Sequence, residues 1–231
     1  RTSEAHLLEE NSRLRNSVED RHRFGDIVGK SSAMQEMYEM LLLAASSDNN
    51  VILYGESGTG KELAAKTIHD MSGRRNENFV PINCGAIPEN LLESEFFGYK
   101  KGSFTGAAAD NTGVLDLADK GSLFLDEIGE IKTGFQIKLL RAIEGGGFTP
   151  IGGSKLHKPD FRVIAATNIN LTEAVKSGEM RSDFFYRIHV IPIYLPPLRE
   201  RKEDIPLLTE YFLKAYDRKM RPQFTSKIMD T

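Results

Sequence analysis

The sequence lacks several features that would place it in particular classes of protein. Cys84 is the one cysteine among 231 residues, which excludes an intramolecular disulfide and favours a reducing, cytoplasmic location. We expect its thiol to be a small buried group rather than a reactive one. No apolar run approaches about 18 residues, and no charged-then-apolar leader opens the chain, so the sequence predicts neither a membrane span nor an export signal.

Signals for nucleic-acid binding, metal binding and covalent catalysis are also missing. The 30 basic residues are balanced by 33 acidic ones, a net charge of −3, so no global positive field indicates DNA binding by this segment. The five histidines are scattered without metal-ligand spacing. No serine or cysteine lies in a nucleophile-elbow pattern, which leaves hydrolysis through a covalent intermediate unsupported.

From residue 26 onward, short apolar runs alternate with segments of helical periodicity. Near-continuous apolarity in the runs predicts strands buried on both faces, and therefore a parallel α/β sheet covered by helices. The expected helices include residues 61–71 and 133–144. A glycine-rich stretch at 145–159 looks like an inserted hairpin. The expected strands are residues 51–54, 79–82, 122–125, 162–166 and 190–193.

The two ends of the chain are expected to lie outside this sheet. Residues 1–23 are polar with a sparse apolar stripe, which is compatible with a linker helix, a short coiled coil or a solvated tail. Residues 203–220 carry apolar side chains at helical spacing and predict the first helix of a smaller lid. We expect an α/β core over 24–197 and the beginning of a truncated lid over 198–231. Because the chain starts at Arg1 and stops in a polar stretch, it is interpreted as a fragment.

A glycine-rich loop predicts phosphate binding. It follows the strand 51–54 and precedes an apolar helix, and its residues are Gly55, Glu56, Ser57, Gly58, Thr59, Gly60, Lys61 and Glu62. Glycines let successive backbone N–H groups face a phosphate at a helix N-terminus, and Lys61 would reach the β and γ phosphates. Glu62 stands where Ser or Thr usually ligates magnesium, which shifts metal binding towards Asp126. A glycine-rich turn without a ligand is the alternative.

Polar residues follow two further strands. Asp126 and Glu127 end an apolar strand, at the edge where open parallel sheets bind ligands. Asp126 suits Mg²⁺, and Glu127 suits positioning or deprotonating the attacking water. Thr167 and Asn168 end the next strand and can sense the γ-phosphate or orient the water. Either pair alone would also fit an ordinary strand-end turn.

A third motif lies between these two, at Gly102, Ser103, Phe104, Thr105, Gly106 and Ala107. Small residues around Phe104 leave it few local packing partners and a permissive backbone. We therefore predict an exposed contact residue on a mobile loop, because exposed aromatics commonly mark partner sites. The alternative is a buried turn with Phe104 packed inward.

Together these residues resemble the central AAA+ domain of the activators of bacterial sigma-54, the bacterial enhancer-binding proteins. The resemblance covers residues 24 to about 213. It is carried by the phosphate loop at 55–62, including Glu62, and by the segments at 102–107, 124–130 and 195–201. Family members typically have Ala where this chain has Ser103, and Phe where it has Met180.

The resemblance implies further roles. Phe104 and Thr105, flanked by Lys100 and Lys101, would touch sigma-54 within RNA polymerase. Arg181 and Arg187 would reach the nucleotide of a neighbouring subunit in a hexameric or heptameric ring. Asn83 would hold Glu127 in an inactive rotamer, although a plain strand-end residue would look similar.

The resemblance also implies an adenine pocket within this sequence and two domains outside it. Ile27, Val28 and Gly29 would line the adenine pocket, although a short hydrophobic turn would look the same. DNA would be bound only through a separate C-terminal domain, and an upstream domain would receive a phosphorylation or ligand signal.

The expected function is therefore ATP- and Mg²⁺-dependent remodelling of sigma-54 RNA polymerase. Two alternatives remain open at this point. One is another AAA+ remodelling enzyme, such as an unfoldase or helicase loader, and the other is a nucleotide-dependent interaction module without turnover.

Overall fold

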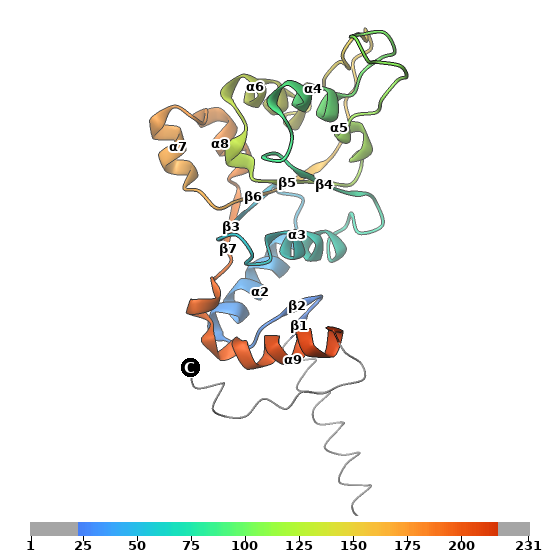
Figure 1. Cartoon of the computed structure of the whole chain (residues 1–231). Helices are drawn as coiled ribbons and strands as arrows, with labels where there is room; N and C mark the ends of the chain where they lie inside the picture. The colour runs from blue at the N-terminus through green and yellow to red at the C-terminus, as the bar shows by residue number, and fades with distance from the viewer. Residues whose placement is uncertain (1–22, 217–231) are drawn as a thin grey trace, which may run out of the picture. The chain divides into compact units, whose positions relative to one another are not determined.

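The computed structural model describes residues 23–216 (Figure 1). They form two compact units: residues 39–195 make the larger unit, and residues 23–38 together with 196–216 make the smaller one. Most of the predicted linker at 1–23 and the C-terminal part of the predicted lid lie outside the described residues. The proposed boundaries at 24–197 and 198–231 remain a prediction.

The larger unit is built on a five-stranded sheet in which every neighbouring pair of strands is parallel. The spatial order is β4-β5-β6-β3-β7, so the first strand of this sheet along the chain, β3, lies inside it. The strands lie where the apolar runs predicted them, with ends shifted by at most one residue. They are β3 Val51–Tyr54, β4 Phe79–Asn83, β5 Ser122–Asp126, β6 Arg162–Thr167 and β7 Ile191–Tyr194.

Helices cover both faces of this sheet, as parallel strands require. In Figure 1, α3 lies on one side and α4, α6 and α8 lie on the other. The helices are α3 Lys61–Asp70, α4 Glu89–Phe97, α5 Val114–Leu117, α6 Thr133–Ile143, α7 Leu171–Ser177 and α8 Ser182–Ile188, with a 3₁₀ turn η1 at Ile128–Glu130. All six residues of β6 are buried, so its two faces contribute to two apolar layers. The larger layer packs strand residues against Phe96, Leu139 and Phe184.

The glycine-rich stretch at 145–159 differs from the predicted hairpin. Its only antiparallel pairing among the described residues is one bridge, in which Phe148 and His157 exchange two backbone hydrogen bonds of 3.0 and 2.8 Å. A hairpin does not continue because Ile151 instead pairs in parallel with Tyr99, and Gly147 and Gly152 turn the chain with positive φ angles. The stretch is therefore a loop packed against a second loop.

In the smaller unit, a two-stranded ladder is tied to a C-terminal helical segment. Its elements are β1 Arg23–Phe24, β2 Ile27–Val28, the start of α2 (Ser32–Ala45), η2 Leu198–Glu200, η3 Lys202–Asp204 and α9 Ile205–Tyr216. Asp204 is completely buried and accepts three hydrogen bonds, from Lys30 N, Ser31 N and Ser31 Oγ, at 2.6 to 2.9 Å. The carboxylate thereby fixes the chain that leaves β2.

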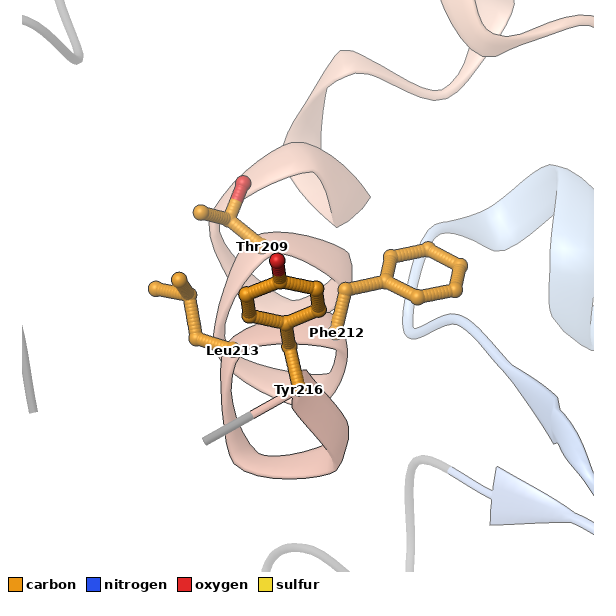
Figure 2. A pocket seen from close by; sticks show the side chains of 4 residues that line it. All are labelled: Thr209, Phe212, Leu213 and Tyr216. Atoms are coloured by element: carbon orange, nitrogen blue, oxygen red, sulfur yellow. The ribbon is translucent and has the colours of Figure 1, made fainter. Parts of the chain in front are cut away.

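One face of α9 is apolar and open. Figure 2 shows Thr209, Phe212, Leu213 and Tyr216 lining a shallow hollow on this helix. The side chains of Phe212 and Tyr216 are 64% and 93% exposed. Within residues 23–216, every helix is too short or too polar to span a lipid bilayer.

Candidate nucleotide site and contact loop

The residues predicted to bind and hydrolyse the nucleotide within one subunit gather at the carboxyl edge of the sheet. Strand register places Tyr54, just before the phosphate loop, opposite Thr167. It also places Asn83 opposite Asp126. The same edge therefore carries the phosphate loop, the acidic pair and the polar strand ends, as ligand sites in open parallel sheets require.

Residues 55–60, which precede α3 in the phosphate loop, have the backbone freedom that is needed to surround an anion. Gly58 and Gly60 have φ angles of 81° and 98°, and a Cβ on either would meet no atom within 4 Å. Gly60 caps α3 without a side-chain hydrogen bond to the first turn, which leaves the helix N–H groups directed outward for an anion. Gly55 is required for a different reason, because a Cβ there would lie 2.7 Å from Thr59 Oγ1 and 3.1 Å from Leu195 O.

Lys61 lies over this loop at the first position of α3. Its ammonium donates to Gly55 O at 2.9 Å and to Glu56 O at 3.0 Å. Both acceptors are neutral carbonyls, so a phosphate oxygen can compete for the ammonium through stronger charge-assisted hydrogen bonds. Glu62 follows on the exposed side of the helix.

Asp126 and Glu127 have different environments although they are adjacent. Asp126 ends β5, and its Oδ1 accepts the Glu127 N–H at 2.9 Å. Glu127 has a left-handed backbone, φ 54° and ψ 44°, which is uncommon for a residue with a side chain. Its carboxylate lies over Gly85, where an added Cβ would be only 2.2 Å from Glu127 Oε2. The two adjacent carboxylates therefore have different neighbours: that of Asp126 accepts a backbone N–H, whereas that of Glu127 lies over Gly85.

The neutral polar residues at this edge are held by local hydrogen bonds. Thr167 is buried, and its hydroxyl accepts the Ile169 N–H at 3.2 Å, while its carbonyl accepts Gly55 N–H at 3.2 Å. Asn168, the next residue, is exposed. Asn83 Oδ1 accepts the Ala86 N–H at 2.9 Å and lies 3.5 Å from the Cβ position of Gly85, the same position that the Glu127 carboxylate approaches.

The two predicted arginine fingers are exposed on α8 and its N-terminal cap. The Arg181 guanidinium forms a two-pronged pair with Asp183 at 3.0 and 2.7 Å. This pair lowers the pKa of the Asp183 carboxyl. Arg187 donates to Ile143 O at 3.0 Å. Exposure of both leaves them accessible to a second molecule, and the intervening Tyr186 is 73% exposed.

The predicted contact loop projects Phe104 as a half-exposed side chain. Phe104 is 43% exposed and contacts the Tyr99 ring edge to face, with centroids 5.0 Å apart. Gly102 and Gly106 have positive φ angles and open space around them, and Gly102 N–H donates to Ala107 O at 2.9 Å across the loop. The buried-turn alternative does not hold for Phe104.

A stalk of backbone hydrogen bonds supports this loop. Tyr99 and Asn111 exchange two of them, at 3.0 and 2.9 Å, and Lys100 N–H donates to Ile151 O at 2.9 Å. The side chain of Lys100 is paired with Asp110, which also accepts the Lys101 N–H. At Ser103 the hydroxyl is buried without a hydrogen-bond partner among the described residues, so the serine gains nothing here over a smaller alanine.

The segment predicted to line an adenine pocket lies in the smaller unit. Ile27 and Val28 form β2 and are 7% and 5% exposed. Gly29 is required by close packing, since a Cβ there would approach Met34 Cγ to 2.7 Å. Its carbonyl accepts the Tyr38 hydroxyl at 3.2 Å. The adenine role remains a prediction.

Cys84 is buried, as expected for a lone cysteine. Burial, followed by the nearby charges of Asp126 and Glu127, raises the pKa of its thiol to about 12. The thiol is therefore protonated at neutral pH and is a poor nucleophile.

Two residues at the site were missed by sequence reasoning. Gly85 has to be glycine because the Glu127 carboxylate occupies the space of its side chain. Gln136 is completely buried on α6 and binds three backbone groups. A signal for Gln136 was present, since it is the one polar residue on the apolar face formed with Phe135, Leu139 and Leu140.

The parallel sheet with its order β4-β5-β6-β3-β7, a glycine-rich loop ending in Lys61 and an acidic strand end define a P-loop NTPase fold of the AAA+ class. The family model described as "Sigma-54 interaction domain" matches residues 27–194. The chain belongs to this family, which confirms the resemblance found in the sequence.

Relatives and solved structures agree with this assignment. The chain is 47% identical over 210 residues to the Nif-specific regulatory protein of Herbaspirillum seropedicae, a match that covers 91% of this chain and 39% of that protein. It is 48% identical over 209 residues to the formate hydrogenlyase transcriptional activator FhlA of Escherichia coli, covering 89% and 30%. The crystal structure of NtrX from Brucella abortus in complex with ATP superposes with a TM-score of 0.81 at 35% identity, covering 98% of this chain and 52% of that one. The chain thus spans well under half the length of these two curated relatives.

Proposed function

We propose that this chain is the ATP-hydrolysing domain of a transcriptional activator that remodels sigma-54 RNA polymerase so that promoters open. One observation supports the proposal most directly: the larger unit carries the glycine-rich loop, Lys61 and the Asp126–Glu127 pair at one edge of its sheet, together with a half-exposed Phe104 loop. Family membership favours this function over an unfoldase or a helicase loader. An interaction module without turnover would have no use for Glu127 in a strained backbone over Gly85.

Each residue of the edge has a chemical task in hydrolysis. The N–H groups of the phosphate loop and the N-terminus of α3 bind the phosphates, and Lys61 offsets charge on the β and γ groups. Glu127 orients and deprotonates the attacking water, while Thr167 and Asn168 respond to the γ-phosphate. Asn83 restrains the side chain of Glu127, since both side chains lie beside Gly85.

Asp126 fits Mg²⁺ binding by its donor chemistry. Magnesium prefers one or two carboxylates together with phosphate oxygens and water. Oδ1 of Asp126 is occupied by the Glu127 N–H, so the second carboxylate oxygen would serve the metal. Bound Mg²⁺ would neutralise charge that develops on the transferring phosphoryl group.

The site is completed across a subunit boundary in this proposal. Arg181 and Arg187 are exposed on α8 and its N-terminal cap, where they can reach the nucleotide of a neighbour in a ring. Such an arginine raises the turnover rate about 10³–10⁵-fold. Turnover per subunit should therefore rise steeply with protein concentration, and a phosphate-release assay across concentrations tests this.

Sigma-54 contact is assigned to Phe104 and Thr105. We expect Thr105→Ala to retain ATP turnover and to lose promoter opening in a purified transcription system. Thr112→Ala is the matched control, because Thr112 is also exposed but lies beyond the loop. Normal promoter opening by Thr105→Ala would refute the assignment of the contact.

A further inference from the structure

Gln136 is buried within the larger unit, and both polar atoms of its side chain form hydrogen bonds. Its Nε2 donates to Ile131 O at 2.8 Å and to Glu179 O at 3.0 Å, and its Oε1 accepts the Arg181 N–H at 2.9 Å. The residue is 0% exposed. Because two partners are carbonyls and one is an N–H group, a single orientation of the amide satisfies all three.

The three partners come from two functional segments. Ile131 ends the η1 turn, which begins directly after Glu127. Glu179 and Arg181 lie directly before α8, and Arg181 is its N-terminal cap. Met180 between them is buried, and its N–H donates to Ala174 O at 2.9 Å. One side chain therefore joins the backbone after the water-positioning carboxylate to the backbone that presents an arginine finger.

We propose that Gln136 is a positioning residue, which fixes the backbone of Arg181 to the segment after Glu127 and so sets where the finger reaches. This inference rests on the finger role given to Arg181 in the proposed function. Any shift of the η1 turn in one subunit is then passed to the finger that this subunit offers to its neighbour. When the hydrogen bonds of Gln136 are broken, ATP turnover should therefore fall mostly at the neighbour's site rather than at the subunit's own site.

Hydrogen exchange tests the link without any catalytic assay. Gln136→Met keeps the length of the side chain and removes all three hydrogen bonds, whereas Gln136→Glu keeps an acceptor for the Arg181 N–H but places an oxygen against the Ile131 and Glu179 carbonyls, where only a protonated carboxyl can donate to one of them. We expect the Arg181 amide to exchange about tenfold faster or more in Gln136→Met, and more slowly in Gln136→Glu than in Gln136→Met. An unchanged rate in folded Gln136→Met would overturn the proposal.

Mixed assemblies separate positioning from general damage. Gln136→Met alone should lose roughly 10²-fold in turnover, because a misplaced finger is costly. Mixed with Glu127→Gln subunits, which cannot hydrolyse but offer intact fingers, each Gln136→Met subunit should regain turnover, as Arg181→Ala subunits should. Gln35→Met, at an exposed site on α2, is the control and should match the wild type throughout.

The outcomes are distinguishable. If mixing restores Arg181→Ala but not Gln136→Met, the glutamine serves its own site or only the core, and the proposal fails. If the wild-type chain shows no turnover at any concentration, the proposed function fails instead, and the exchange rate of the Arg181 amide still decides whether the link exists.

Discussion

The two edges of the sheet use polar residues in opposite ways. At the amino edge, two arginines are each held by several partners. Arg74 binds Asp48, Asp160 and the Gly121 carbonyl, while the completely buried Arg162 donates to Asn49 O at 2.9 Å and Ala44 O at 2.7 Å. These contacts join segments that are up to 118 residues apart in sequence, such as β6 and α2.

At the carboxyl edge, the corresponding groups are bound loosely or are strained. Lys61 has two neutral carbonyls as acceptors, Glu127 has a left-handed backbone, and Gly58 and Gly60 turn in open space. The amino edge therefore stabilises the fold, whereas the carboxyl edge keeps groups available for a ligand. A left-handed backbone alone does not distinguish the edges, because Lys120 at the amino edge also has a positive φ angle, 64°; the difference lies in how the charged side chains are paired.

The largest expected effect is at the carboxyl edge. Glu127→Gln should lower ATP turnover about 10²–10⁴-fold, because the side chain can no longer accept a proton from water. Its unfolding free energy should stay within about 0.5 kcal/mol of the wild type. Nucleotide affinity, measured by titration with a fluorescent ATP analogue, should also be retained.

A second variant at this edge sharpens the comparison. Gly85→Ala should reduce turnover while keeping Glu127, because the new methyl group displaces the carboxylate. Full turnover by Gly85→Ala would show that the carboxylate position over Gly85 is irrelevant to catalysis.

At the amino edge we expect a loss of stability instead. Gly121→Ala should lower the free energy of unfolding by about 3 kcal/mol, because a Cβ there would lie 2.0 Å from the backbone oxygen of Asn78. Chemical denaturation measures this change. Gly134→Ala on α6 is the control: its Cβ meets nothing within 4 Å, so alanine should stabilise the helix by about 0.5–1 kcal/mol. Equal effects of the two substitutions would contradict the comparison.

The smallest effect concerns pH and His69. This histidine is buried at the amino edge, with Nδ1 3.0 Å from Ser122 Oγ. Burial, followed by the charge of Lys66, lowers its pKa in the folded state. The unfolded chain, with a pKa of about 6.5, binds more protons than the folded chain below that pH, so stability should fall as the pH falls below about 6.5. His69→Gln should flatten this dependence in urea titrations, and an unchanged slope would count against it.

Local patterns were sufficient to predict the sheet and the polar residues that end its strands. Apolar runs located the five strands, and strand-end polarity located Asp126, Glu127 and Thr167, because both signals are contained in a few adjacent residues. The exposure of Phe104 followed in the same way from its small neighbours.

The parts that could not be predicted depend on contacts between distant segments. Gln136 meets Glu179 43 residues away, and Asp204 meets Lys30 174 residues away. The hairpin expected at 145–159 was wrong in extent, because Ile151 pairs with Tyr99 across the loops rather than within its own segment. The residues of this stretch alone do not reveal that Ile151 pairs with Tyr99.

The central claim is that ATP hydrolysis at the carboxyl edge controls the binding of the Phe104 loop to sigma-54. The most direct measurement is retention of purified sigma-54 by the chain on size-exclusion chromatography, with ADP plus aluminium fluoride as a mimic of the transferring phosphoryl group. We predict a stable complex with the mimic, none with ADP alone, and none with the mimic when Phe104 is replaced by Ala. Equal retention with and without the mimic would contradict the account.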